Sequence, residues 1–265
     1  MKPYRPLDTL KVEDSEVKNE EDLVAIESVF ELRINGEFLA SFICTPGFER
    51  ELSVGHLLST GVINSPRDIR GAKYSKHRCN IETRNGASIH LDRYLSRVCR
   101  VMNTKQSAFD VLELLQLEGK ATSISQAVDV HESKIIEHSE ILLKNQEIRS
   151  RTGATHGALV ASLLSGRHVL AEDLGRHNAM DKVLGLAVAK NMNLNTSLAI
   201  LSGRLTADVV SKCVWTGIPL LISFAVATDA GIKLARKWNL TLVGALHENG
   251  MRIYNTGAAR LLFDK

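Results

Sequence analysis

One run of eleven residues in the second half of the chain concentrates side chains that could bind a charged ligand. It reads Glu172-Asp173-Leu174-Gly175-Arg176-His177-Asn178-Ala179-Met180-Asp181-Lys182. The apolar residues 169–171 before it predict a short buried strand, and the apolar spacing from Met180 to Val188 predicts a helix with one stripe facing a core. The polar groups therefore lie at a strand-to-helix junction. Unpaired amide N–H groups and the helix dipole favour a phosphate or another anion there.

Helical spacing predicts which polar side chains of this run share a face of the helix. His177 and Asp181 are four residues apart, as are Asn178 and Lys182, so each pair is expected on one face, opposite the apolar stripe. Arg176 begins the helix, where its guanidinium could bind a phosphate through two parallel hydrogen bonds. For any single residue, an ordinary solvated helix face is the favoured alternative. The combination of Gly, Arg, His and Asn at one helix entry favours a ligand site.

Two more segments place similar side chains where predicted elements begin or end. Ser202-Gly203-Arg204 follows a predicted strand at 198–201, and Thr155 and His156 precede a helix predicted around 156–164. In a sheet of parallel strands, ligands bind beyond the carboxyl ends of the strands. We therefore predict a phosphate-bearing ligand at this edge, although neither the Walker nor the Rossmann glycine spacing occurs.

The chain divides into three parts by pattern. Residues 1–22 are expected to form a loose polar tail, and residues 23–105 a β-rich α+β domain with Asn-Gly hairpins at 35–36 and 85–86 and a helix over 49–59. Residues 106–265 begin with helices, one of them predicted from Ser123 to Leu143. Strands then alternate with helices, which predicts a mostly parallel sheet covered by helices, with an antiparallel strand at one edge.

Composition excludes several classes of protein. The net charge of +3 is mild, and no basic run is interleaved with aromatic residues, so nucleic-acid binding is not expected. No apolar stretch is long enough to span a bilayer, and the charged N-terminus is unlike a signal peptide. We expect a soluble cytoplasmic protein without membrane contact. No Cys-x-x-Cys or deaminase-type zinc motif is present, so no intrinsic metal is predicted.

The four cysteines are widely spaced, which is typical of reduced thiols. Cys44 and Cys213 lie in apolar segments and are expected to be buried and inert. Cys99 lies between Arg97 and Arg100, and neighbouring cations lower the pKa of a thiol. Cys99 is therefore the candidate reactive cysteine.

Taken together, these motifs resemble those of the formate dehydrogenase accessory proteins, the FdhD family. The run 172–182 is similar to the family signature, and the resemblance covers about residues 27–257. Further matching segments are Cys44-Thr45-Pro46-Gly47, Glu51–Leu58, Arg151–His156, Ser202-Gly203-Arg204, Gly217-Ile218-Pro219 and Leu242-Val243-Gly244.

The resemblance implies a three-layer, cytidine-deaminase-like α/β domain beside a smaller N-terminal domain, assembled as a homodimer. It implies a sulfur carrier that accepts persulfide sulfur from a cysteine desulfurase and passes it to the molybdenum bis-pterin guanine dinucleotide. That cofactor then enters the catalytic subunit of formate dehydrogenase. An apolar edge around Val209, Val210 and Val214 is a candidate dimer contact.

The candidate cofactor-binding residues combine the helix entries with a last segment that the resemblance assigns to the cofactor. They are Thr155, His156, Glu172, Asp173, Arg176, His177, Asn178, Asp181, Lys182, Ser202, Gly203, Arg204, Ala245, Leu246, His247, Glu248, Asn249 and Gly250. For residues 245–250, a simple hairpin turn at Asn249-Gly250 is the alternative.

One feature departs from the family pattern. Its members carry a Cys-Gly-x-Cys-Gly loop whose first cysteine holds the persulfide, whereas residues 97–110 contain only Cys99. Since one accessible thiolate suffices for a persulfide, Cys99 is one candidate carrier. The alternative is a non-catalytic protein that binds the same cofactor without moving sulfur. A nucleotide-processing enzyme is disfavoured because zinc ligands are missing and fold analogy alone does not carry function.

Overall fold

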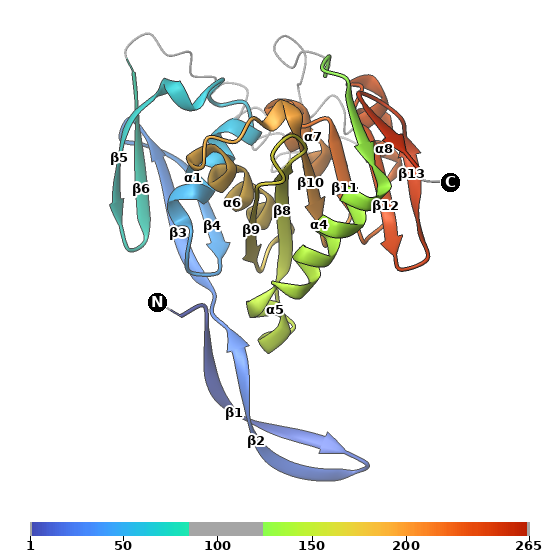
Figure 1. Ribbon diagram of the computed structural model, residues 1–265. Coiled ribbons are helices and arrows are strands. Elements are labelled where there is room, and N and C mark those ends of the chain that lie inside the picture. The colour runs from blue at the N-terminus through green and yellow to red at the C-terminus, as the bar shows by residue number, and fades with distance from the viewer. Residues whose placement is uncertain (1, 85–123, 264–265) are drawn as a thin grey trace, which may run out of the picture.

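The computed structural model describes residues 2–84 and 124–263. Figure 1 shows an α/β body with a long two-stranded hairpin projecting from it at the N-terminal end. Within the described ranges, no helix is both long and apolar enough to cross a membrane.

The projecting hairpin replaces the loose tail expected for residues 1–22. Strands β1 (Tyr4–Glu13) and β2 (Glu16–Ala25) pair antiparallel along their whole length. The turn between them places Asp14 and Ser15 at φ 52° and 69°. Charged residues dominate this segment and the turn is Asp-Ser rather than Asn-Gly, so the sequence carried only a weak hairpin signal.

The N-terminal part of the body is a four-stranded sheet covered by one helix. Its strands are β3 (Ser28–Ile34), β4 (Glu37–Cys44), β5 (Ile69–Ser75) and β6 (Arg78–Thr83), in the order β4-β3-β6-β5. Helix α1 (Glu49–Ser59) and the short helix η1 (Pro66–Asp68) connect β4 to β5. Both the Asn35-Gly36 hairpin and the helix over 49–59 are confirmed, whereas the hairpin predicted at Asn85-Gly86 lies outside the described residues.

The C-terminal part contains a six-stranded sheet of mixed direction. Its strands are β8 (His156–Ser162), β9 (His168–Asp173), β10 (Ser197–Leu201), β11 (Leu220–Ser223), β12 (Thr241–His247) and β13 (Gly250–Asn255). They lie in the order β13-β12-β11-β10-β8-β9. The neighbouring pairs β10–β11 and β11–β12 are parallel, whereas the pairs β8–β9, β8–β10 and β12–β13 are antiparallel. The expectation of a mostly parallel sheet is therefore wrong.

The sheet differs from the predicted one mainly because residues 156–162 form strand β8 rather than the predicted helix. Their apolar core, Ala158–Ala161, is buried on both faces of the sheet. A short uninterrupted apolar run has no period, so it cannot separate a buried strand from a buried helix. The helix predicted from Ser123 is also shorter than expected, because residues 128–131 form strand β7 before α4 begins.

Helices cover both faces of the C-terminal sheet. Helices α6 (Arg176–Ala189), α7 (Ala207–Thr216) and α8 (Asp229–Lys237) share a core with Ala199 and Leu201. Helix α4 (Glu132–Lys144) packs on the other face, against Leu198 and Ile200. The remaining elements are α5 (Glu147–Thr152), η2 (Leu194–Thr196) and the parallel pair β7 (Val128–His131) and β14 (Ala259–Leu262).

The apolar edge considered for dimer contact belongs to this core instead. Val209, Val210 and Val214 of α7 are buried within the chain itself, so they do not form an open apolar surface.

Helices α1 and α6 approach each other closely enough that only glycine fits at two points. A Cβ on Gly55 would be 1.8 Å from the Asp181 carbonyl oxygen, and one on Gly185 would be 2.0 Å from the Glu51 carbonyl oxygen. In Figure 1, α1 lies between the N-terminal sheet and α6. This contact joins the two parts of the body backbone to backbone.

Replacing Gly55 by alanine should therefore destabilise the protein, although alanine is the better helix former. The Cβ forces α1 and α6 apart, and overpacking of this kind typically costs about 1–3 kcal/mol of unfolding free energy. Urea unfolding followed by circular dichroism measures the effect. Gly71→Ala is the control, because a Cβ there meets no atom within 4 Å. Equal stability of Gly55→Ala and wild type would contradict the close contact.

Candidate functional site

The predicted strand-to-helix junction exists as expected. Strand β9 ends at Asp173 and helix α6 begins at Arg176. Strand β8 runs antiparallel to both β9 and β10, so its first residue, His156, lies opposite Asp173, and the Ser202 amide donates to the Gly157 carbonyl at 2.9 Å. Residues from three separate segments thus meet at one edge of the sheet.

Asp173 and Lys182 form a buried ion pair at this edge. Lys182 Nζ lies 2.7 Å from Asp173 Oδ2, and neither side chain is exposed by more than 1%. Lys182 also donates to the carbonyl and hydroxyl oxygens of Thr45, at 2.8 and 3.0 Å. The other Asp173 oxygen accepts from the Gly175 amide and from Asn178 Nδ2, both at 3.0 Å. The pair therefore bonds the segment after β4 to the beginning of α6.

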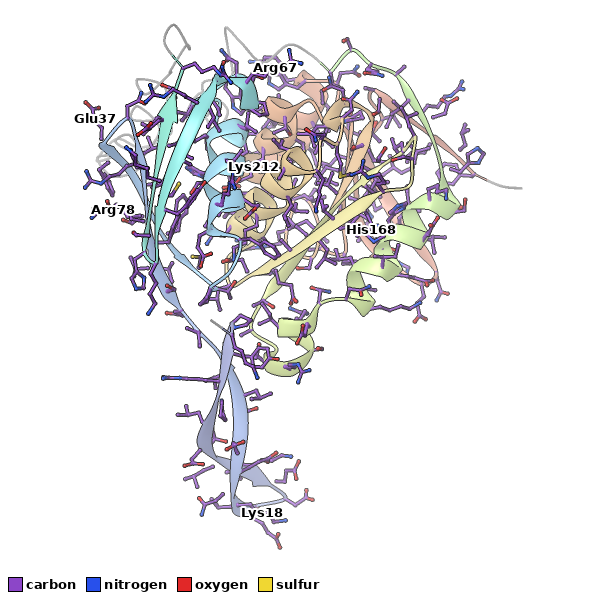
Figure 2. The ribbon with its side chains drawn as sticks, turned by 60° about the vertical axis from the view of Figure 1, so that its left-hand side comes forward. Lys18, Glu37, Arg67, Arg78, His168 and Lys212 are labelled. Atoms are coloured by element: carbon purple, nitrogen blue, oxygen red, sulfur yellow. The ribbon has the colours of Figure 1, made fainter. Side chains whose placement is uncertain are left out.

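Asp181, the residue before Lys182 on α6, is the centre of a second buried cluster. Its carboxylate lies 2.6 Å from Lys212 Nζ of α7 and 2.9 Å from His56 Nδ1 of α1, and it accepts from Ser59 Oγ at 2.5 Å. Figure 2 shows Lys212 inside the body beside α1. Burial alone would raise the pKa of Asp181, but the Lys212 ammonium and the His56 hydrogen bond hold it below its usual range.

The sequence pattern predicted Asp181 and Lys182 on an open polar face of the helix, opposite its apolar stripe. The structure buries both side chains instead. Each is 1% exposed. Helix α6 has the sheet on one side and α1 on another, so its polar residues opposite the sheet face α1 rather than solvent. Through these contacts Lys182 connects α6 to the segment after β4, and Asp181 connects α6 to α1 and α7.

Glu172 and Thr155 are also engaged internally. The Glu172 carboxylate accepts from the amides of Ile148 and Arg149, at 2.9 and 2.8 Å, and from Thr155 Oγ1 at 2.8 Å. The first two bonds satisfy amides in the first turn of α5, where a carboxylate is also favoured by the helix dipole. This glutamate therefore positions α5 and the beginning of β8.

The remaining residues of the edge are more open and carry positive or neutral donors. Ser202 Oγ accepts from the Gly157 amide at 3.0 Å and is hydrogen-bonded to His156 Nδ1 at 3.1 Å. Burial lowers the pKa of His156, and the nearby cations Arg149 and Arg176 lower it further. The lowered pKa favours the neutral imidazole of His156 at pH 7.

Arg176 has an unused donor at the beginning of α6. Its Nε is buried and has no hydrogen-bond partner among the described residues. The aliphatic part of Arg176 passes over Gly203, where a Cβ would lie 2.9 Å from the arginine Cβ and Cδ. Glycine at 203 is what allows this approach. A buried donor without an acceptor is costly, which favours an anionic ligand at this point.

His177 is held by a carboxylate that the sequence interpretation missed. Its Nε2 lies 2.9 Å from Asp208 Oδ2 on α7, and Asp208 also bonds to the Thr206 hydroxyl and the Val209 amide. Burial raises the pKa of Asp208, but the His177 contact outweighs it and holds the pKa below its usual range. The Thr-x-Asp spacing at 206–208, typical of a helix start, was the available signal.

Residues 245–250 lie two strands beyond β10 along the same sheet edge. The Ala245 amide donates to the Ala225 carbonyl at 2.9 Å, and Ala245 has a φ of 49°. Leu246 is buried in the opposite core, whereas His247, Glu248 and Asn249 are exposed. Since β12 ends at His247 and β13 begins at Gly250, this segment forms a hairpin turn at the edge of the site.

The three described cysteines are all buried, and burial raises their thiol pKa values. That of Cys44 rises to about 12, and those of Cys79 and Cys213 also rise. Cys99 lies outside the described residues. Across ranges 2–84 and 124–263, no three His, Cys, Asp or Glu side chains are placed to hold a metal ion.

The Asp181 cluster predicts a pH-dependent stability. Because the folded pKa is lowered, the contribution of this carboxylate to stability is fully present above its unfolded pKa of about 3.9, and it is lost progressively as the pH falls from there toward the lower folded pKa. Asp181→Asn leaves Lys212 buried without its partner, which should cost about 3–5 kcal/mol at pH 7.

The measurement is urea unfolding at pH 7, 5, 4 and 3. The stability difference between wild type and Asp181→Asn should shrink as the pH is lowered, while the exposed hairpin variant Asp8→Asn should stay within about 0.5 kcal/mol of wild type at pH 7. A difference that is constant from pH 7 to pH 3 would contradict the charged cluster.

Comparison with known proteins identifies the family of this chain. Residues 25–262 match the model of the FdhD/NarQ family. A protein from Methanocaldococcus jannaschii named "Protein FdhD" is 33% identical, covering 89% of this chain and 90% of the relative. A "Sulfur carrier protein FdhD" from Wolinella succinogenes is 31% identical over 89% of this chain and 81% of its own.

A solved structure shares the fold. It is a candidate formate dehydrogenase accessory protein from Desulfotalea psychrophila, with a TM-score of 0.75, 22% identity, and coverage of 96% of this chain and 98% of its own. The chain therefore belongs to the FdhD/NarQ family.

Proposed function

We propose that this protein is a sulfur carrier for formate dehydrogenase. It accepts persulfide sulfur from a cysteine desulfurase and passes it to the molybdenum bis-pterin guanine dinucleotide before this cofactor enters the catalytic subunit. The names of the relatives from Wolinella succinogenes and Sulfolobus acidocaldarius, both "Sulfur carrier protein FdhD", support this role. From the resemblance to the family we further propose a cytoplasmic homodimer with a deaminase-like C-terminal layer arrangement.

The observation that carries the cofactor part of the proposal is the unpaired Arg176 Nε at the mouth of α6. The cofactor contains pyrophosphate groups, and an arginine at a helix N-terminus suits a pyrophosphate oxygen. His177 and the exposed Arg204 are positioned at the same mouth, on α6 and after β10. Arg176 and Arg204 form a cationic entry for the dinucleotide, and His177, paired with Asp208, borders it.

The surrounding residues divide by role. His156 and Ser202 offer neutral polar groups beside the arginine, suited to a phosphate ester or a base edge. Asp173, Asp181 and Lys182 act indirectly, because their contacts fix α6 and hence Arg176. Residues 245–250 border the site two strands away.

The sulfur step falls to Cys99, since the other three thiols are buried and protonated. Its thiolate attacks the outer sulfur of the desulfurase persulfide, so a new S–S bond forms on Cys99. The S–S bond of the donor breaks and the desulfurase cysteine leaves as a thiolate. This exchange is balanced without an external oxidant.

One sequence feature favours a second candidate, a non-catalytic protein that binds the same cofactor. The chain lacks the Cys-Gly-x-Cys-Gly loop found in the family. The two candidates share the nucleotide site and differ in the need for a cysteine.

The nucleotide site is tested with GDP as the probe, by isothermal titration calorimetry. Arg176→Gln should weaken binding by about tenfold or more, because a charge-assisted hydrogen bond contributes roughly 1.5–3 kcal/mol. The exposed Arg236→Gln on α8 is the matched control and should bind as wild type does. Wild-type affinity in Arg176→Gln would exclude this site.

Sulfur transfer is tested by intact-protein mass spectrometry after incubation with a cysteine desulfurase and cysteine. Wild type and the control Cys44→Ala should gain the mass of one sulfur atom, and Cys99→Ala should gain none. Cys99→Ala should still bind GDP. If no protein gains sulfur while GDP binding is intact, the non-catalytic candidate is favoured and the carrier is excluded.

A further inference from the structure

A groove separate from the sheet edge lies between α1, strand β5 and the second half of α6. It has a volume of about 450 Å³, within the usual range for small-molecule sites. Its walls are largely apolar and come from Val54, Ile69, Ala72, Ile81, Val188 and Ala189. None of these residues belongs to the proposed cofactor site.

A single cation is available at one side of this groove. The Arg50 guanidinium lies over the Tyr74 ring, 5.7 Å from its centroid. Arg50 makes no ion pair with a carboxylate of the described residues, whereas the neighbouring Arg70 is paired with Glu82 at 2.7 Å. Burial raises the pKa of Tyr74, so its phenol is neutral and does not repel an anion.

The groove continues past Tyr74 into a second hollow of about 430 Å³ that shares Arg50, Glu51 and Tyr74 with the first. Phe48 borders this hollow with 49% of its surface exposed. Its φ of 60° lies in the left-handed region, which is a costly conformation for a bulky residue and is often kept for function. The Tyr74 ring thus lies against the Arg50 guanidinium, and Phe48 adds a second aromatic side chain to the lining of the second hollow.

We propose that this groove is a second binding site, for a small molecule with a planar apolar body and one anionic group. The apolar walls contact the apolar body of the ligand, and the exposed Phe48 and Tyr74 rings offer surfaces on which it can stack. Arg50 pairs with the anionic group of the ligand. Glu51 also lines the groove, and its carboxylate repels an anion, so the anionic group must lie beside Arg50.

The chain offers two clean variants for testing the groove. Gly71 lines it, a Cβ there meets no atom within 4 Å, and its φ is not positive, so the backbone accepts a side chain and Gly71→Leu is the variant that reduces the space. Arg50→Gln removes only the charge. Thr9→Leu on the projecting hairpin and Arg78→Gln on the sheet are matched controls outside the groove.

The probe is 1-anilinonaphthalene-8-sulfonate, a planar apolar molecule with one sulfonate, and binding is followed by its fluorescence. We expect saturable binding of one probe per chain to wild type and both controls. Arg50→Gln should bind about tenfold more weakly, and Gly71→Leu should lose the saturable signal. Circular dichroism melting verifies that each variant is folded. Wild-type affinity in either groove variant, or no saturable binding to wild type, would overturn the proposal.

Discussion

The buried ion pair between Lys182 and Asp173 is complete only when the N-terminal part of the body is docked. A lysine has three N–H donors, and here they are directed to Asp173 and to the two oxygens of Thr45. Thr45 follows β4, on the other part of the body. Without it, the ammonium would be buried with unused donors, which is strongly unfavourable. The position of α6 relative to the sheet therefore depends on a residue 137 positions earlier in the chain.

A second pair fixes the same helix from another side. Asp181 binds Lys212 of α7 and His56 of α1, while Gly55 and Gly185 bring the helix backbones together. Buried ion pairs often contribute little net stability, because desolvation offsets their attraction. Here the ion pairs select one packing arrangement of α1 on α6, because any other arrangement would leave buried charges without partners. Arg176 and His177 consequently begin a helix that is fixed at two points. A ligand that binds there therefore pays a smaller entropy cost for ordering the site.

The sequence predicted the junction but not the partners of its charges. The order strand, glycine, polar run, helix is local, and its periodicity could be read directly. The partners His56 and Lys212 lie 125 and 31 residues from Asp181, and no local pattern connects them. A helix covered on two sides also breaks the rule that polar residues opposite the apolar stripe face water. Strand β8 was missed for a different reason, because its apolar run has no period.

Internal pairing also changes the charge that a ligand meets. The run 172–182 contains three carboxylates against Arg176 and Lys182, so its composition alone would not favour an anion. Glu172 is bound to the first turn of α5, and Asp173 and Asp181 are matched by Lys182 and Lys212. Asp208 is in turn matched by His177. Among the described residues of this opening, Arg176 keeps an unpaired Nε, and the exposed Arg204 follows the glycine that Arg176 packs on. The motif is acidic in sequence but forms a cationic opening. Its carboxylates are paired inside the protein, where they position the helix that begins with Arg176.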